Sequence, residues 1–358
     1  MKQNRVEAVL ANLEQMGLTQ MLVTDPISIF YLTGRMIKPM ERFYALYLHQ
    51  NGGHKIFINQ LETVPEDLGV EKVRFSDTDP YLDLVCQTVD AREILGVDKN
   101  MSARFLLPLM ERDAAAGYRN ASLALDQARS VKDAQEIALM VKASQINDQA
   151  MEVFKTLVHT GITEREVAEQ MKKIYQDLGA EDFSFAPLVA FGQNAASGHH
   201  YPDDTKLNPG DCVLFDVGCT YQGYCSDMTR TYFYQTVTPR QRILYDIVKE
   251  ANFQAELAVR PGVPLKNLDA IARDVITQAG YGPRFTHRLG HFIGLETHDY
   301  GDVSAAAEEL AAPGNIFSIE PGIYLEGEMG VRIEDLVLVT ETGCQVLNQV
   351  SKDLEIIP

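Results

Sequence analysis

The chain has 358 residues, of which 46% are hydrophobic and 23% are charged, so it can fold around a sizeable core and is long enough for about two domains. Its formal net charge is −18, which argues against nucleic acid as a partner because an acidic surface repels phosphates. No basic cluster, signal peptide or run of about 18 apolar residues indicates a membrane partner. The five cysteines form no C-x-x-C pair, which fits a reducing compartment, and we expect a cytoplasmic protein.

The first third of the chain, residues 1–124, predicts a small α/β domain. Residues 5–16 have the apolar spacing of an amphipathic helix. Two further stretches, 80–90 and 102–116, are also helix-like. They alternate with short apolar runs that predict strands at 21–23, 45–48, 55–58 and 94–97. This alternation is typical of α/β domains.

The second part, residues 125–358, predicts long helices separated by strands. Asp133 with Glu136 and Thr163 with Glu166 have capping-box spacing, which predicts helices over about 133–158 and 164–178. Two more helices are expected, one that starts at Thr238-Pro239 and one over 265–279. Strand-rich segments lie between the helices, at 186–192, 211–233, 284–297, 315–325 and 330–340.

Residues 211–233 predict a hairpin that carries two aspartates. They are rich in β-branched and aromatic residues, with Gly223 near the middle. With the turn between Tyr221 and Gln222, Asp216 and Asp227 would face one another with Cβ atoms about 4.5–5.5 Å apart. Such carboxylates repel unless a cation lies between them, and a divalent metal is the simplest cation. A capping or turn role for one aspartate is the alternative.

Residues 316–338 repeat this pattern with two glutamates. A hairpin centred on Gly327 would place Glu320 opposite Glu334, each within an otherwise apolar run. A carboxylate is rarely buried in such a strand without a partner. Two hairpins with facing acids therefore predict a hard-oxygen site suited to two divalent metals.

Five of the eight histidines fall in two short segments of the second part. One segment contains His199 and His200, and the other contains His287, His291 and His298. A single histidine is more often a structural residue than a functional one. Five of them beside an acidic site favour nitrogen ligands or proton donors.

These motifs resemble those of the proline-specific peptidases of the pita-bread metallopeptidase family, the Xaa-Pro dipeptidases (prolidases) and aminopeptidase P. The similarity extends over about residues 130–358, and residues 25–34 match the N-terminal domain more loosely. It implies an α/β (α+β) fold, with a creatinase/prolidase-like domain at 1–124 and a pita-bread catalytic domain at 125–358. The motifs are Phe215-Asp216-Val217-Gly218, Ser226-Asp227-Met228-Thr229-Arg230, Gly290-His291, Glu320-Pro321-Gly322 and Arg332-Ile333-Glu334-Asp335.

The resemblance implies two divalent metal ions per subunit, held by five residues. Asp216 would chelate one ion, and Asp227 and Glu334 would bridge both. His291 and Glu320 would complete the second ion. Oxygen ligands dominate this set and favour Mn²⁺, with Co²⁺ or Zn²⁺ as alternatives.

The resemblance also implies roles for residues around the metals. His199 and His298 would contact the substrate, and one or the other would stabilise the developing oxyanion. Glu320 would move a proton, while His287 and Arg332 would lie behind the ligands.

The segment after His298 departs from the family pattern. Asp299 follows where glutamate is usual, and Phe292 stands where a glycine is common. Some prolidases grip the dipeptide carboxylate with an arginine shortly after this histidine. This chain has no arginine between Arg288 and Arg332, so we take Arg288 as the candidate for substrate binding, with a lysine or arginine from the N-terminal domain of a partner subunit as the alternative. His200 has no assigned role.

The implied activity is hydrolysis of the Xaa-Pro bond in proline-containing dipeptides or short peptides, by a homodimer. An Xaa-Pro dipeptidase is our first interpretation. An aminopeptidase P that acts on longer peptides is the alternative, favoured by the missing arginine. A metal-free binding module, or a metal-free hydrolase of the creatinase type, is more remote because all five ligand positions are filled.

Overall fold

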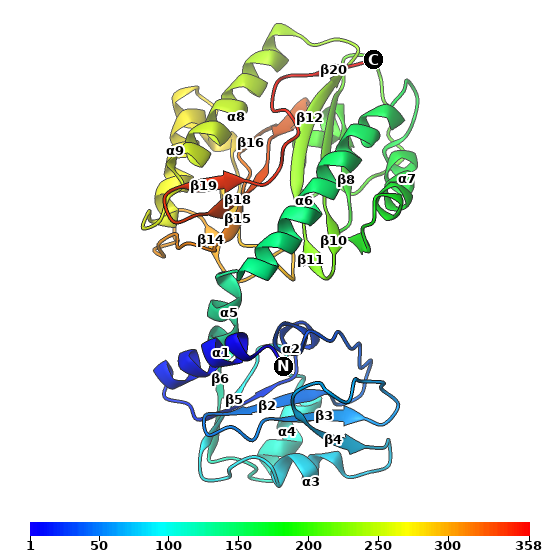
Figure 1. Ribbon diagram of the computed structural model, residues 1–358. Coiled ribbons are helices and arrows are strands. Elements are labelled where there is room, and N and C mark those ends of the chain that lie inside the picture. The colour runs from blue at the N-terminus through cyan, green and yellow to red at the C-terminus, as the bar shows by residue number, and fades with distance from the viewer. The chain divides into compact units, whose positions relative to one another are not determined.

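The computed structural model describes residues 1–358, which divide into two units, Met1–Arg129 and Ser130–Pro358 (Figure 1). Both units mix helices and strands, as the sequence predicts for an α/β protein. None of the helices combines the length and the apolar character needed to cross a membrane.

The first unit is built on one sheet of six strands, β1 (Gln20–Val23), β2 (Ala45–His49), β3 (Lys55–Asn59), β4 (Glu71–Phe75), β5 (Ile94–Val97) and β6 (Gly117–Asn120). Their order is β4-β3-β2-β1-β5-β6, and β1 pairs antiparallel with β2 and parallel with β5. The helices are α1 (Gln3–Gln15), α2 (Pro26–Thr33), α3 (Tyr81–Cys86), α4 (Ala103–Glu111) and α5 (Ser122–Ser130). The four predicted strands are confirmed. The edge strands β4 and β6 escaped prediction because their sequences are largely polar.

The second unit has four long helices, α6 (Ala134–Phe154), α7 (Glu164–Asp177), α8 (Pro239–Ala258) and α9 (Leu265–Gln278). The capping boxes that start α6 and α7 are formed as predicted. Proline at the first position of α8 follows the N-cap Thr238. The helix starts are therefore encoded locally, within four residues of sequence.

A four-stranded sheet lies between these two pairs of helices (Figure 1). Its order is β20 (Ile356–Ile357), β12 (Met228–Tyr234), β9 (Cys212–Val217) and β8 (Leu188–Phe191). Along β9, Val213 and Phe215 pack with α6 and α7, whereas Cys212 and Leu214 pack with α8 and α9. This alternation follows from the two-residue period of a strand. It leaves Asp216 in phase with Cys212 and Leu214.

Shorter strands complete the second unit. They form two three-stranded sheets, β11-β10-β7 and β15-β18-β19, and two strand pairs, β16-β17 and β13-β14. Their bounds are β7 (Asp182–Phe183), β10 (Cys219–Tyr221), β11 (Tyr224–Cys225), β13 (Gly290–His291), β14 (Asp302–Val303), β15 (Ile316–Ile319), β16 (Gly322–Leu325), β17 (Met329–Arg332), β18 (Asp335–Val339) and β19 (Cys344–Val346). The expected strand-rich segment 284–297 is mostly irregular, with only β13 in it.

Candidate metal centre

The first hairpin is formed, but its register differs from the predicted one by two residues. Asp216 pairs with Thr229, and Tyr221 pairs with Tyr224. The turn is therefore Gln222-Gly223, and both residues have positive φ, as a two-residue hairpin turn requires. Asp227 is not directly opposite Asp216, which corrects our expectation. A shift of two residues keeps the side chains on the same face, so both aspartates still point toward one site.

The second hairpin has the predicted register. Ile319 pairs with Asp335 on one side of the glutamates, and Gly322 pairs with Arg332 on the other. Both ladders are centred on Gly327, whose φ is +75°. Glu320 and Glu334 lie in the break between the two ladders. Their side chains consequently leave the hairpin at the same level.

His291 reaches this site from the short strand β13. A Cβ atom on the preceding Gly290 would lie 1.9 Å from the carbonyl oxygen of Ser318, so only glycine permits this close approach to β15. The His291 N–H donates to Ser318 Oγ at 3.0 Å, and that hydroxyl donates to Glu320 Oε1 at 3.2 Å. Ser318 thus fixes His291 and Glu320 relative to one another.

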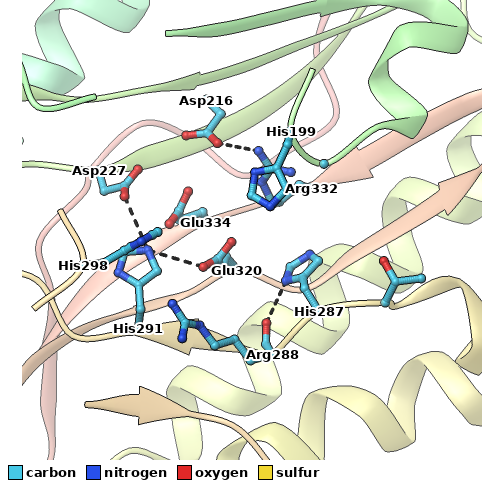
Figure 2. A pocket seen from close by; sticks show the side chains of 12 residues that line it. His199, Asp216, Asp227, His287, Arg288, His291, His298, Glu320, Arg332 and Glu334 are labelled. Atoms are coloured by element: carbon cyan, nitrogen blue, oxygen red, sulfur yellow. Dashed lines mark hydrogen bonds and ion pairs between the residues drawn. The ribbon is translucent and has the colours of Figure 1, made fainter. Parts of the chain in front are cut away.

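These side chains line one cavity of about 620 Å³ (Figure 2). His291 Nε2 lies 3.6 Å from Asp227 Oδ2 and 3.5 Å from Glu320 Oε1. Ligand atoms of Asp227, His291 and Glu334 lie within 4.8 Å of one another. The cavity brings together all ten predicted site residues, which are His199, Asp216, Asp227, His287, Arg288, His291, His298, Glu320, Arg332 and Glu334.

The cavity concentrates negative charge away from water. Burial and then the neighbouring carboxylates hold the pKa of Asp227 and of Glu334 well above the ordinary range. Burial also raises the pKa of Glu320 to about 7. The carboxylate atom Oδ1 of Asp216 and that of Asp227 are buried without a hydrogen-bond partner. A divalent cation would satisfy both atoms and reverse the repulsion, so this donor set fits a metal.

Burial lowers the pKa of His291 to about 3. The ring is therefore neutral at physiological pH, and its Nε2 can offer a lone pair to a metal. Its Nδ1 lies 3.2 Å from the Phe292 carbonyl oxygen, which favours a proton on Nδ1 and leaves Nε2 as the ligand atom. His291 could thus offer a metal one nitrogen among oxygen donors.

A hydrogen-bonded chain behind the acids orients them. Arg332 donates to Asp216 Oδ2 at 2.5 Å, to Thr229 Oγ1 at 3.1 Å and to the Tyr324 hydroxyl at 2.9 Å. Thr229 donates in turn to Glu334 Oε2 at 2.7 Å, and His287 Nε2 lies 2.8 Å from the Tyr324 hydroxyl. Sequence reasoning missed Thr229 and Tyr324. Thr229 lies two residues after Asp227, and residues two apart in a strand point to the same face. This spacing could have predicted that Thr229 lies near the acids.

The remaining predicted residues border the cavity. The His298 ring meets the His291 ring edge to face, with centroids 4.2 Å apart. The His199 side chain is exposed at the cavity wall. Arg288 forms an ion pair with Asp302 of β14. These groups leave the cavity with hydrogen-bond donors opposite its acids.

The fold and this acidic cavity together define a metal-dependent hydrolase, and comparison with known proteins specifies the class. The sequence pattern of metallopeptidase family M24 matches residues 138–341 of this chain. The creatinase/prolidase N-terminal domain matches residues 5–131. The chain belongs to metallopeptidase family M24. The predicted fold, a creatinase-like domain followed by a pita-bread domain, and the predicted enzyme class are confirmed.

Relatives cover the chain almost from end to end. An uncharacterized peptidase of Staphylococcus aureus (strain bovine RF122 / ET3-1) is 36% identical over 333 residues, which are 92% of this chain and 94% of the relative. The crystal structure of dipeptidase PepE from Mycobacterium ulcerans has a TM-score of 0.92 and 35% identity, and the match covers 100% and 98% of the two chains. That of the prolidase from Thermococcus sibiricus has a TM-score of 0.92 and 32% identity, with 99% of each chain covered.

Proposed function

We propose that this peptidase hydrolyses the Xaa-Pro bond of dipeptides with two divalent metal ions. Asp216 would bind one ion, and His291 and Glu320 would bind the other. Asp227 and Glu334 would bind both ions. The observation that carries the proposal is the convergence of four carboxylates and one neutral imidazole on a cavity with a single deeply buried arginine. Such an excess of acids favours bound cations, because without them the carboxylates repel one another or must take up protons. Mn²⁺ is the metal we expect, because oxygen donors dominate.

The bound metals would supply Lewis acidity and a water that loses its proton near neutral pH. Around them, Glu320 accepts a proton and passes it to the departing proline nitrogen. His298 and His199 donate hydrogen bonds to the carbonyl oxygen as negative charge develops on it. Arg332 keeps Asp216 in place directly and Glu334 in place through Thr229.

Arg288 is the group that would bind the free carboxylate of a dipeptide. Its side chain is 36% exposed at the cavity, whereas Arg332 is buried and fully engaged with Asp216, Thr229 and Tyr324. The names of the relatives, a dipeptidase and a prolidase, favour the same specificity. The ion pair of Arg288 with Asp302 competes with a substrate carboxylate, and this observation keeps aminopeptidase P as the second candidate.

The decisive experiment offers Ala-Pro and Ala-Pro-Gly together to protein that has been stripped with a chelator and reloaded with Mn²⁺. Cleavage of Ala-Pro alone is the expected result. In that case Arg288→Ala should raise KM for Ala-Pro about tenfold or more, because a charge-assisted hydrogen bond of about 1.5–3 kcal/mol is lost. Preferential cleavage of Ala-Pro-Gly would establish the aminopeptidase instead. If neither peptide is cleaved after loading with Mn²⁺, Co²⁺ or Zn²⁺, the proposed proline specificity is wrong.

His298→Ala tests the proposed role of the cavity histidines. We expect kcat to fall about 10²-fold with the bound metal unchanged, because an oxyanion donor is lost while every ligand remains. Metal content measured by mass spectrometry together with kcat separates this result from the loss of a ligand. Full activity in this variant would contradict the role.

A further inference from the structure

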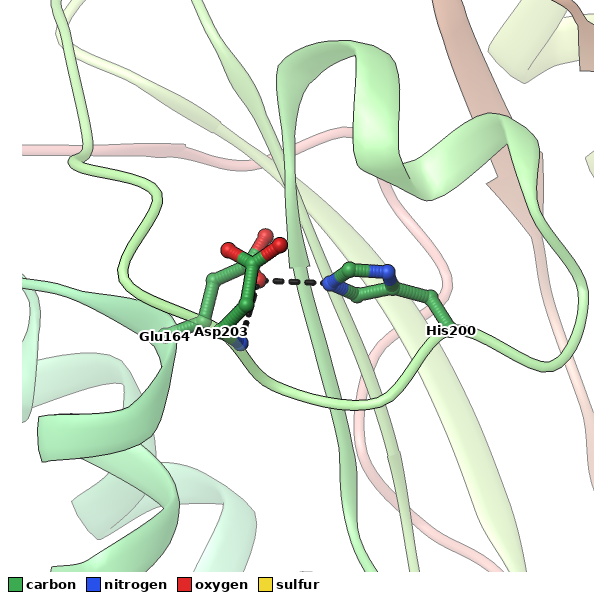
Figure 3. Close-up of side chains that lie close together, drawn as sticks. All are labelled: Glu164, His200 and Asp203. Carbon is green, nitrogen blue, oxygen red and sulfur yellow. Dashed lines mark hydrogen bonds and ion pairs between the residues drawn. The ribbon is translucent and has the colours of Figure 1, made fainter.

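A second cluster of titratable residues lies outside the cavity, where α7 begins (Figure 3). Glu164, the first residue of α7, is completely buried. Its Oε1 accepts hydrogen bonds from the Phe191 N–H at 2.8 Å and from Asn194 Nδ2 at 3.0 Å. Its Oε2 accepts from His200 Nε2 at 2.6 Å and from the Asp203 N–H at 3.1 Å. Four donors fill the acceptor sites of one carboxylate, so the cluster is complete without a metal.

One donor, Phe191, is the last residue of β8, and the other three lie in the segment between β8 and β9. Asn194 is near the start of this segment, and His200 and Asp203 are near the point where it packs beside α7. Main-chain bonds reinforce this attachment, since the N–H groups of Glu164 and Arg165 donate to the carbonyl oxygens of Thr205 and Asp203. Residues 192–205, which we call the α7 loop, are therefore tied at both ends to a single buried side chain and its helix.

The α7 loop carries His199 to the cavity. Figures 2 and 3 show the two adjacent histidines in different surroundings, with His199 at the cavity and His200 directed at Glu164. The His199 side chain is exposed, so close packing does not fix its position. The neighbouring residue, by contrast, is anchored by the shortest of the four hydrogen bonds.

We propose that Glu164 is a positioning residue for peptide hydrolysis, acting through the α7 loop and His200 to hold His199 at the cavity. The proposal rests on the proposed function in assigning His199 to the reaction. A displacement of about 1 Å in a group near the reacting atoms can lower the rate about 10²-fold. Anchoring of this loop is therefore expected to affect kcat although Glu164 touches neither substrate nor metal.

Glu164→Gln is the main variant. Glutamine keeps one acceptor oxygen, but its NH₂ group can only donate. One of the two pairs of donors that now bind Oε1 and Oε2 would therefore lose its acceptor. We expect kcat to fall about 10- to 100-fold, with KM within about twofold and metal content unchanged. Glu166→Gln is the matched control, because it removes the same charge two residues further along the same turn. Its carboxylate is exposed and accepts hydrogen bonds from Thr163 alone, so kcat should stay at the wild-type value.

A double-mutant cycle with His199→Ala isolates the path of the effect. If Glu164 acts through His199, the Glu164→Gln change should lower kcat less than about twofold once His199 has already been removed. An equal fall in both backgrounds would overturn the proposal. His200→Ala removes the anchor from the other side and serves if Glu164→Gln folds poorly, and the same non-additivity is expected.

Amide hydrogen exchange tests the anchoring independently of activity. In metal-loaded protein the α7 loop should exchange faster in Glu164→Gln than in wild type or Glu166→Gln, with α6 unchanged. Unaltered exchange in the loop would refute the proposal even if the enzyme is active. A wild-type protein that cleaves no Xaa-Pro peptide, together with faster loop exchange in Glu164→Gln, would refute the proposed function while the anchoring stands.

Discussion

The cavity is one of two clusters of buried charged residues in this unit. The two clusters take neighbouring residues from the same two segments, around residues 229–230 and 334–335. Glu334 lines the cavity and accepts a hydrogen bond from Thr229, while the next residues, Arg230 and Asp335, form a buried ion pair at 2.6 Å. Lys352 joins this pair, lying 2.9 Å from Asp335 and 2.6 Å from Glu256. The second set, which we call the balanced cluster, consists of Arg230, Lys352, Asp335 and Glu256. Neighbouring residues of a strand point to opposite faces, which separates the two sets.

The pKa values of Asp335 and Asp227 show how the clusters differ, although burial raises the pKa of Glu256 in the balanced cluster to about 7. Burial alone would raise the pKa of Asp335, but Arg230 and Lys352 outweigh it and hold the pKa below its ordinary value. In the cavity burial and like charges act together, and the pKa of Asp227 is raised. The balanced cluster is thus neutralised by the chain itself. The cavity has four carboxylates around Arg332, so its charge must be balanced by cations or protons from solution.

Asp227→Asn changes the cavity and should have the largest effect. We expect activity to fall at least about 10³-fold, or ~4 kcal/mol of transition-state stabilisation, because a proposed metal ligand is lost. The metal-stripped variant should nonetheless melt no lower than the metal-stripped wild type, since the change removes like-charge repulsion. Peptide hydrolysis, metal content and thermal melting in chelator measure these effects. Wild-type activity in the variant would contradict the ligand assignment.

Asp335→Asn changes the balanced cluster and should act on stability. It leaves the Arg230 guanidinium buried with a neutral partner, and breaking a buried ion pair costs about 3–5 kcal/mol of unfolding free energy. Urea denaturation followed by a probe in residues 130–358 measures this loss. Asp353→Asn is the control, because the pair of Lys249 with Asp353 is exposed and should contribute little to stability. Equal losses in both variants would remove the distinction between buried and exposed pairs.

Much of the fold and most of the site could be predicted because their signals are local. The capping residues Asp133 and Thr163 mark helix starts within four positions. Gly327 at the centre of the second hairpin gives the register that brings Glu320 and Glu334 together. The first hairpin was assigned the wrong turn because Gln222 gives little sign of its positive φ. The period of two preserved the site despite this error.

What could not be predicted depends on contacts between distant segments. Tyr324 joins His287 to Arg332, and a tyrosine in a strand gives no sign of such a role. His200 lies beside a cavity histidine in sequence but turns to Glu164. Segment 284–297 resembled a strand by composition, yet Gly290 is needed there for close approach to Ser318. In each case a partner more than 25 residues away determines the outcome.

Addition of metal sharpens the contrast between the clusters. Mn²⁺ at about 100 times its dissociation constant should stabilise residues 130–358 by about 2.7 kcal/mol for each bound ion, because it binds only the folded state. The gain should survive in Asp335→Asn, whose cavity is intact, and vanish in Asp227→Asn. Urea denaturation with Mn²⁺ and with chelator measures it. A gain that disappears in Asp335→Asn would mean that the two clusters are not independent.

The smallest expected effect concerns Asp148, an acid beside the balanced cluster. Burial raises its pKa from 3.8 to about 6, although the Gln349 N–H donates to its Oδ2. Between these values the folded state binds more protons than the unfolded state, so the stability contributed by protonated Asp148 is present below about pH 4 and lost as pH rises through about 6. Asparagine keeps the acceptor and cannot ionise. Asp148→Asn should therefore match wild type near pH 4 and exceed it by about 1–2 kcal/mol above pH 7, after allowance for solvent screening. Urea midpoints between pH 4 and 8 decide this, and a difference that is independent of pH would show that the Asp148 charge is compensated by the balanced cluster.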